Sequence, residues 1–85
     1  MSNHPTRLHQ RLDATDEVEL ITHDHAVAHK AEQARINRKH VNFVFWNGEA
    51  EEIVEGMVTF FRNEDPVRFA VRRGNPPAIP AAMPQ

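Results

Sequence analysis

The chain is predicted to form one small α+β domain with a βαβαβ-like order, a short three-stranded sheet and two helices. Two runs rich in β-branched and aromatic residues, 41–46 and 67–72, indicate strands. An amphipathic stretch at 48–62 lies between them, and an alanine-rich stretch at 24–39 precedes them. At 85 residues, the chain is long enough for a single domain.

The compact part of the chain is predicted to span residues 15–73. The preceding segment 1–14 and the proline-rich segment 74–85, GNPPAIPAAMPQ, show no periodic pattern and are expected to be flexible. A core of roughly 60 residues buries only about 60% of its unfolded surface and is marginally stable. Since the chain has no cysteine, a disulfide cannot support it. Oligomerisation or partner binding is therefore expected.

The two clearest predicted strands flank the segment 48–62. The run 41–46, VNFVFW, is apolar on nearly both faces, as in a central strand. The run 67–72 alternates, with valine and phenylalanine on one face and arginine on the other. With a helix between them, the strands would form a right-handed βαβ unit and lie parallel.

The segment 48–62 is predicted to be a helix because its apolar residues fall on one arc of a helical wheel. Asn47 is a suitable N-cap, the first turn is acidic, and Pro66 follows the end. The apolar residues of this arc are Ala50, Ile53, Val54, Met57, Val58, Phe60 and Phe61.

An alternative for this segment is a β-hairpin. Asn47-Gly48 is a strong turn signal, and it would join strands 41–46 and 52–61. The domain would then be an N-terminal helix followed by a small SH3- or Sm-like β-meander. The helix is preferred because the extended form puts apolar residues on both faces, and a domain of this size can scarcely cover both.

The upstream segment 24–39 is predicted to be a helix with Asp24 as its cap and a basic last turn. The segment 17–22 is predicted to be the third strand, because two parallel strands alone make a poor sheet. The alternative is one long helix that starts at Asp16.

Composition excludes several classes of function. Ten basic and twelve acidic side chains do not make a general polyanion binder. No apolar run approaches the roughly 18 residues of a membrane span, and residues 1–12 lack the apolar stretch of a signal peptide. We therefore expect a cytoplasmic protein with no membrane partner.

No catalytic centre is recognisable, and we expect a protein that is not an enzyme and has no cofactor. Cysteine and tyrosine are absent, and Ser2 is the only serine. The three glycines form no phosphate-binding loop. The six histidines lie in the first forty residues, and His25 and His29 stand one helical turn apart as two metal ligands would. The remaining ligands of a zinc site are missing, so no metal site is predicted.

The function predicted from these features is protein binding, by a small regulatory protein that acts as an accessory, adaptor or inhibitor, or as a subunit of a larger assembly. Trp46 ends its strand, and Phe60 and Phe61 lie at the edge of the apolar arc, so these three are the candidate contact residues. The partner would be another protein or a second copy of the chain.

The alternative function is nucleic-acid binding through two basic clusters, which would gain weight in the barrel-like alternative fold. Against it, these side chains could simply pair with the acidic segments 13–24 and 49–65. The clusters are Arg35, Arg38 and Lys39, and Arg68, Arg72 and Arg73.

Overall fold

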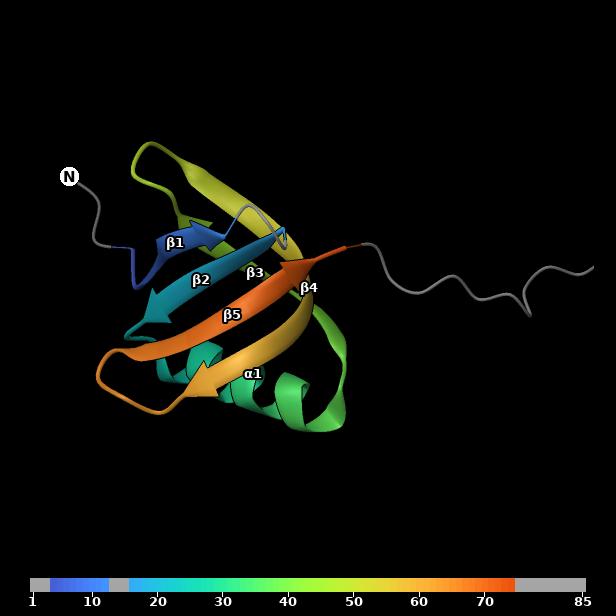
Figure 1. Cartoon of the computed structure of the whole chain (residues 1–85). Coiled ribbons are helices and arrows are strands. Elements are labelled where there is room, and N and C mark those ends of the chain that lie inside the picture. The colour runs from blue at the N-terminus through green and yellow to red at the C-terminus, as the bar shows by residue number, and fades with distance from the viewer. Residues whose placement is uncertain (1–3, 13–15, 75–85) are drawn as a thin grey trace, which may run out of the picture.

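The computed structural model describes residues 4–12 and 16–74, which form five strands and one helix (Figure 1). In chain order the elements are β1 (Thr6–Leu12), β2 (Glu17–Thr22), α1 (His25–Asn37), β3 (His40–Trp46), β4 (Glu51–Arg62) and β5 (Val67–Arg73). The strands close into a barrel in the order β1-β2-β5-β4-β3. All neighbours are antiparallel except β1 and β3, which meet in parallel at one pair, Arg7 and Trp46.

The core lies inside the barrel, with α1 packed against one end of it (Figure 1). The alternating inward residues of β2, β3, β4 and β5 supply most of the core, and the rings of Phe43 and Phe69 pack with centroids 4.8 Å apart. The helix contributes the buried Ala31 and Ala34, whose small side chains let it approach the strands closely, and Val27 packs against the core beside them. The fully buried apolar residues are Val18, Leu20, Ala31, Phe45, Val54, Phe69 and Val71.

The three-stranded sheet with two helices is wrong, chiefly because the segment 48–62 is not a helix. Gly48, with φ of +106°, makes a turn, and residues 51–62 continue as strand β4. Asn47 does accept hydrogen bonds from the N–H groups of Glu49 and Ala50, at 2.7 and 3.0 Å. This is the bonding of a helix N-cap, so the cap signal is real, but the chain turns into a strand after it.

The objection to the extended form, that both faces of this segment are apolar, is met in two ways. Val54 and Val58 face inward, and a register shift between Val58 and Phe60 then brings Phe61 to the inner side, opposite Phe69. On the outer side Ile53 is simply left exposed. Because the bulge turns Phe61 inward and Ile53 stays exposed to solvent, the outer side of β4 does not need a second layer of structure to cover it.

Gly56 explains why β4 can pair with β3 and β5 at the same point. A Cβ atom on this residue would lie 1.9 Å from the backbone oxygen of Arg72, so only glycine permits this approach. Gly56 is opposite Val41 on one side and Arg73 on the other. The predicted parallel pairing of 41–46 with 67–72 is also wrong, because β4 lies between these two strands.

Strand β1 lies within the segment 1–14 that the sequence left outside the compact domain. It pairs along β2, and the hydroxyl groups of Thr6 and Thr22 form a buried hydrogen bond of 2.8 Å. Its sequence, TRLHQRL, has few apolar residues because much of its outer side faces solvent. The predicted tail beyond Gly74 lies outside the described residues.

The predictions for the segment 17–39 agree with the structure. Residues 17–22 form strand β2, and Asp16 has a positive φ of 55°, which excludes a helix starting there. Asp24 caps α1, since its Oδ1 accepts from the N–H groups of Ala26 and Val27. The helix ends at Asn37, and the capping residue Arg38 that follows takes a left-handed conformation. In the parts of the chain that the structure describes, no helix is long and apolar enough to span a membrane.

The contact between β1 and β3 is the weakest in the barrel, since a single residue pair joins them. Before that pair, a side chain of α1 takes the place of a neighbouring strand. The ammonium group of Lys30 donates to the backbone oxygen of Asn42 at 2.7 Å and lies 4.9 Å from the centre of the Phe43 ring. The helix therefore covers part of the edge of β3 as well as one end of the barrel.

Candidate functional site

The outer side of the β3–β4 hairpin carries an exposed apolar cluster. Val44 and Ile53 are directly opposite each other in the ladder, and 42% and 61% of their surfaces are exposed. Trp46 lies two residues beyond Val44 on the same side and is half-buried. We call these three residues, together with Glu51 and Glu55 beside them, the hairpin face.

The hairpin face is exposed because β4 is longer than β5. The pairing of β4 with β5 begins only at Gly56, so among the described strands residues 51–55 pair with β3 alone. The N–H of Gly74 donates to the backbone oxygen of Glu55 at 3.1 Å as the chain leaves β5. The first half of β4 therefore extends past the end of β5, near the β3–β4 connection at the top of Figure 1.

Charged side chains of both signs border this apolar cluster. Glu51 and Glu55 are exposed on β4, and Glu51 lies 3.2 Å from the imidazole of His4. Arg73 borders the cluster beside Ile53 and Glu55, and the exposed Arg7 of β1 pairs with Trp46 at the other margin. The hairpin face is thus an apolar patch with the two carboxylates on β4 and arginines on the flanking strands.

Glu52 lies on the opposite side of the same strand and fastens the end of the hairpin. The amide of Asn47 donates a hydrogen bond to it, and Arg11 of β1 lies 3.4 Å away. The bond from Asn47, aided by Arg11, lowers the pKa of the Glu52 carboxyl below its ordinary value. Glu52 is therefore committed to holding the loop in place.

The structure does not bring the three predicted contact residues together. Trp46 is opposite Glu51 at one end of β4, whereas Phe60 and Phe61 lie near the other end. Phe60 is half-buried on the outer side, opposite Ala70, and the guanidinium of Arg62 lies 5.5 Å from its ring centre. Phe61 packs against the core. Of the three, only Trp46 belongs to the hairpin face.

A second apolar site lies at the C-terminal end of α1. Ile36 is 60% exposed and lines a hollow of about 150 Å³ with Phe61, Glu32 and Arg35. We call these four residues the helix-end hollow. Arg38 and Lys39 follow directly and are both exposed, so this end of the helix is rich in basic groups.

The two basic clusters are placed very differently. Arg68 is bound to Glu19 of the neighbouring strand, with Nε and Nη2 at 2.9 and 2.6 Å from the same carboxylate oxygen. The Glu19 carboxylate raises the pKa of Arg68 above its ordinary value. Arg72 is exposed on the same strand, and Arg73 is half-buried at its end. Arg35, Arg38 and Lys39 lie at and just after the end of α1. His40, which follows Lys39, pairs with Met57, and Met57 pairs with Arg72, so the sheet brings Arg72 within two strands of this end of the helix.

The candidate metal ligands are not assembled into a site. His25 and His29 are both exposed on α1. Within residues 4–12 and 16–74, no group of three or more histidine, aspartate or glutamate side chains is arranged to hold a metal ion. The pattern of two histidines one turn apart is thus present without the further ligands that zinc needs.

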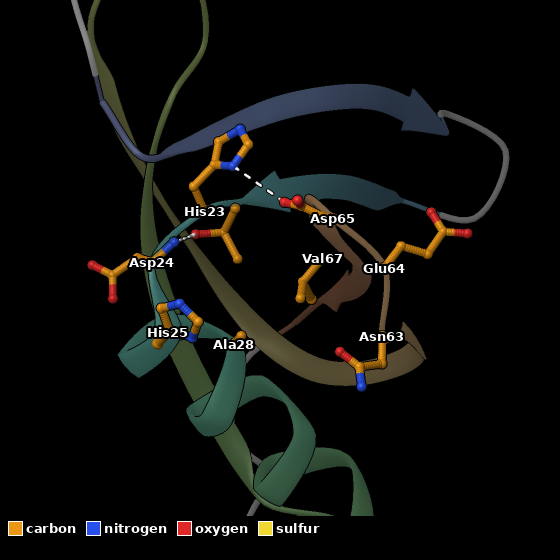
Figure 2. Close-up of a pocket in the computed structure, with 9 residues that line it drawn as sticks. His23, Asp24, His25, Ala28, Asn63, Glu64, Asp65 and Val67 are labelled. Atoms are coloured by element: carbon orange, nitrogen blue, oxygen red, sulfur yellow. Dashed lines mark hydrogen bonds and ion pairs between the residues drawn. The ribbon is translucent and has the colours of Figure 1, made fainter.

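The cavity between the start of α1 and the β4–β5 connection is lined by polar groups (Figure 2). It has a volume of about 290 Å³. The imidazole of His23 lies 3.8 Å from the Asp65 carboxylate, and the N–H of Asp24 donates to the hydroxyl of Thr22 at 3.0 Å. Because the His23 and Asp65 side chains are 58% and 98% exposed, both remain well hydrated.

Comparisons with known proteins give no match to this chain, whether with protein-family models, with curated proteins or with solved structures. The functional argument therefore depends on the geometry described above.

The sequence analysis missed Val44, Ile53 and Ile36 as surface residues. The first two are apolar residues that pair across the hairpin, but the helical interpretation of 48–62 assigned Ile53 to a buried arc. Their signal was the Asn47-Gly48 turn, which indicates a hairpin. The turn alone does not give the register: a two-residue turn would pair 44 with 51, whereas the actual connection, 47–50, places 44 opposite 53.

Proposed function

We propose that this chain is a small non-enzymatic protein-binding protein, whose hairpin face is the contact surface. The observation that carries the proposal is the exposed Val44–Ile53 pair beside Trp46. Solvent-facing positions of a strand are normally polar when the other side is buried. Apolar and aromatic side chains gathered at such positions are the usual anchors of an interface.

The chemistry of the surface indicates what kind of partner it would bind. An apolar centre with Glu51 and Glu55 at its margin favours a partner that presents an apolar side chain flanked by lysine or arginine. The patch is small, so the complex would be weak and transient, with a Kd on the order of 1–100 μM.

Nucleic-acid binding has less support. Arg68 is bound to Glu19, and Arg73 lies beside Glu55, so these two arginines have carboxylates close to them. A polyanion needs a continuous basic surface, and only Arg72 of the β5 cluster is exposed in the sheet near the basic end of α1. The barrel fold raises this alternative in principle, but the distribution of charge does not favour it.

The test is to select peptides that bind the immobilised chain from a random display library. A counter-selection on the Ile53→Lys variant removes peptides that bind elsewhere on the protein. We expect enriched peptides that combine apolar and basic residues. Their affinity, measured by fluorescence polarisation, should fall at least tenfold in Ile53→Lys, because the substitution removes the apolar anchor.

The matched control is Gln10→Lys, which adds the same charge to the exposed side of β1, opposite Glu19. It should leave peptide binding unchanged. The proposal is overturned if no Ile53-dependent peptide is enriched, or if Ile53→Lys and Gln10→Lys bind the selected peptides equally well.

A further inference from the structure

We infer that the hairpin face of one copy of this chain docks into the helix-end hollow of a second copy. The inference rests on the proposed function, because it names the partner of the hairpin face. Among the described residues, the exposed large hydrophobic side chains are Val44, Ile53 and Ile36. The first two belong to the hairpin face and the third to the hollow, so the contact covers all three.

The hollow has a size that suits the side chain of Ile53. Ile53 lies on the outer side of β4 where this strand extends past the end of β5, and it is 61% exposed. The hollow of about 150 Å³ has apolar surfaces on Ile36 and Phe61. An isoleucine side chain that enters it exchanges water for two apolar neighbours, as a core residue does. Phe61 thereby takes a part in binding, although from a different surface than the sequence predicted.

The two sites are complementary in charge. The helix-end hollow has Arg35 at its rim, with Arg38 and Lys39 beyond it, against the single carboxylate of Glu32. The hairpin face has exposed Glu51 and Glu55 on β4, with Arg73 and Arg7 at its borders on β5 and β1. Opposite charges therefore meet when the two sites join. Two hairpin faces placed together would instead bring carboxylates against carboxylates, which disfavours a symmetric dimer through this surface.

The arrangement of the sites determines the kind of assembly. The hairpin connection and α1 lie at opposite ends of the molecule in Figure 1, and Ile53 and Phe61 are eight positions apart on the same strand. A copy bound through its hairpin face keeps its own hollow available. Such a head-to-tail contact adds further copies, in an open chain or a ring, and does not stop at two.

Sedimentation velocity over a concentration series, up to about 1 mM because the contact is weak, tests this inference. The wild-type chain should show a weight-average mass that rises with concentration beyond that of a dimer. The rise should weaken severalfold between low and high salt, because the charges are exposed. The Ile53→Lys and Ile36→Lys variants should each be monomeric, and Gln10→Lys should associate like the wild type.

The decisive measurement mixes the two monomeric variants. Ile53→Lys retains an intact hollow and Ile36→Lys retains an intact hairpin face, so their mixture should form a one-to-one dimer that grows no further. Circular dichroism of each variant checks that these exposed substitutions leave the fold intact.

Three results would overturn the inference: a wild-type chain that stays monomeric, association that survives Ile36→Lys, or a mixture that does not dimerise. Association that requires co-purified nucleic acid, removed by nuclease, also overturns it. If the chain does not self-associate while Ile53-dependent peptides are still selected, this inference fails and the proposed function stands. If neither is observed, both fail.

Discussion

The outer sides of the barrel at β2–β5 and at β3–β4 are both formed by antiparallel ladders, but their outward side chains are covered to different extents. At β2–β5, Ala70 is almost fully covered, with Glu19 on one side and Phe60 on the other, and Arg68 closes the row by binding Glu19. At β3–β4, the corresponding central pair is Val44–Ile53, and both residues are exposed. On the first surface the apolar and charged side chains are covered or bonded by other residues of the chain. On the second surface apolar side chains remain exposed and could contact a partner.

The difference comes from strand length more than from composition. Both surfaces contain apolar residues and carboxylates. At β2–β5 a strand lies on each side of β5, whereas residues 51–55 of β4 have β3 alone. An apolar residue on a strand is covered only where neighbouring strands or long side chains flank it. Strand β4 contributes Phe60 to the first surface and Ile53 to the second, so substitutions in this strand test the difference between them.

The largest loss of stability is expected from Gly56→Ala, which disrupts the pairing of β4 with β5 where the two surfaces meet. The new Cβ would lie 1.9 Å from the backbone oxygen of Arg72, so β4 and β5 must separate locally. We expect a loss of at least about 3 kcal/mol in the free energy of unfolding, measured by urea denaturation. Gly74→Ala is the control, since nothing lies within 4 Å of its Cβ position, and near-equal stability of the two variants would contradict the close approach.

The next effect contrasts two neighbouring residues of β4. Val54→Ala removes a fully buried side chain and should cost about 2 kcal/mol. Ile53→Thr, on the exposed side, should change the stability by no more than about 0.5 kcal/mol while weakening peptide binding. Thermal unfolding followed by circular dichroism compares them, and a large destabilisation by Ile53→Thr would show that the hairpin face is covered within the chain.

A smaller effect is expected from Arg68→Ala on the satisfied surface. The substitution leaves Glu19, which is only 8% exposed, without its charged partner. We expect the Tm to fall by a few degrees. Arg72→Ala, at an exposed position of the same strand, should be nearly neutral in calorimetry. Equal shifts for the two variants would mean that the Glu19–Arg68 bond contributes nothing specific.

The smallest effect concerns Glu52 at the end of the hairpin. Its pKa is lowered in the folded chain, so its ionised form contributes stability above its ordinary pKa near 4.5, and this is lost as the pH falls through the lowered value. The contribution is about 0.5 kcal/mol or less because the pair is partly exposed. Glu52→Gln should flatten the pH dependence of unfolding as the pH falls below the ordinary pKa of 4.5, and an unchanged dependence would contradict this role.

Much of the local structure was predictable from the sequence, but its assembly was not. The Asp24 cap and the alternation in 67–72 identified α1 and β5, because these signals depend on neighbouring residues only. Strand β2 was predicted because a sheet needs a third strand. The Asn47 cap misled, since the same side-chain bonds serve a helix start and a hairpin loop. The close approach at Gly56 and the bulge after Val58 depend on residues distant in the chain, so no local pattern revealed them.

The candidate site was predicted only in part. Trp46 was identified because an aromatic residue at a strand end is poorly covered. Ile53 could not be assigned to the surface without knowing that β5 ends at Arg73 and that the first half of β4 extends past this end. The separation of Trp46 from Phe60 likewise follows from the extended form of β4.

Lys30 has a consequence for how the barrel avoids unwanted association. Strand edges with unpaired backbone groups are templates for adding foreign strands, and a charged lysine is a common deterrent. By bonding to the Asn42 oxygen, Lys30 occupies the acceptor that an incoming strand would require. The helix thus protects the backbone of β3 from indiscriminate pairing while the side chains of the same strand stay open to selective contact.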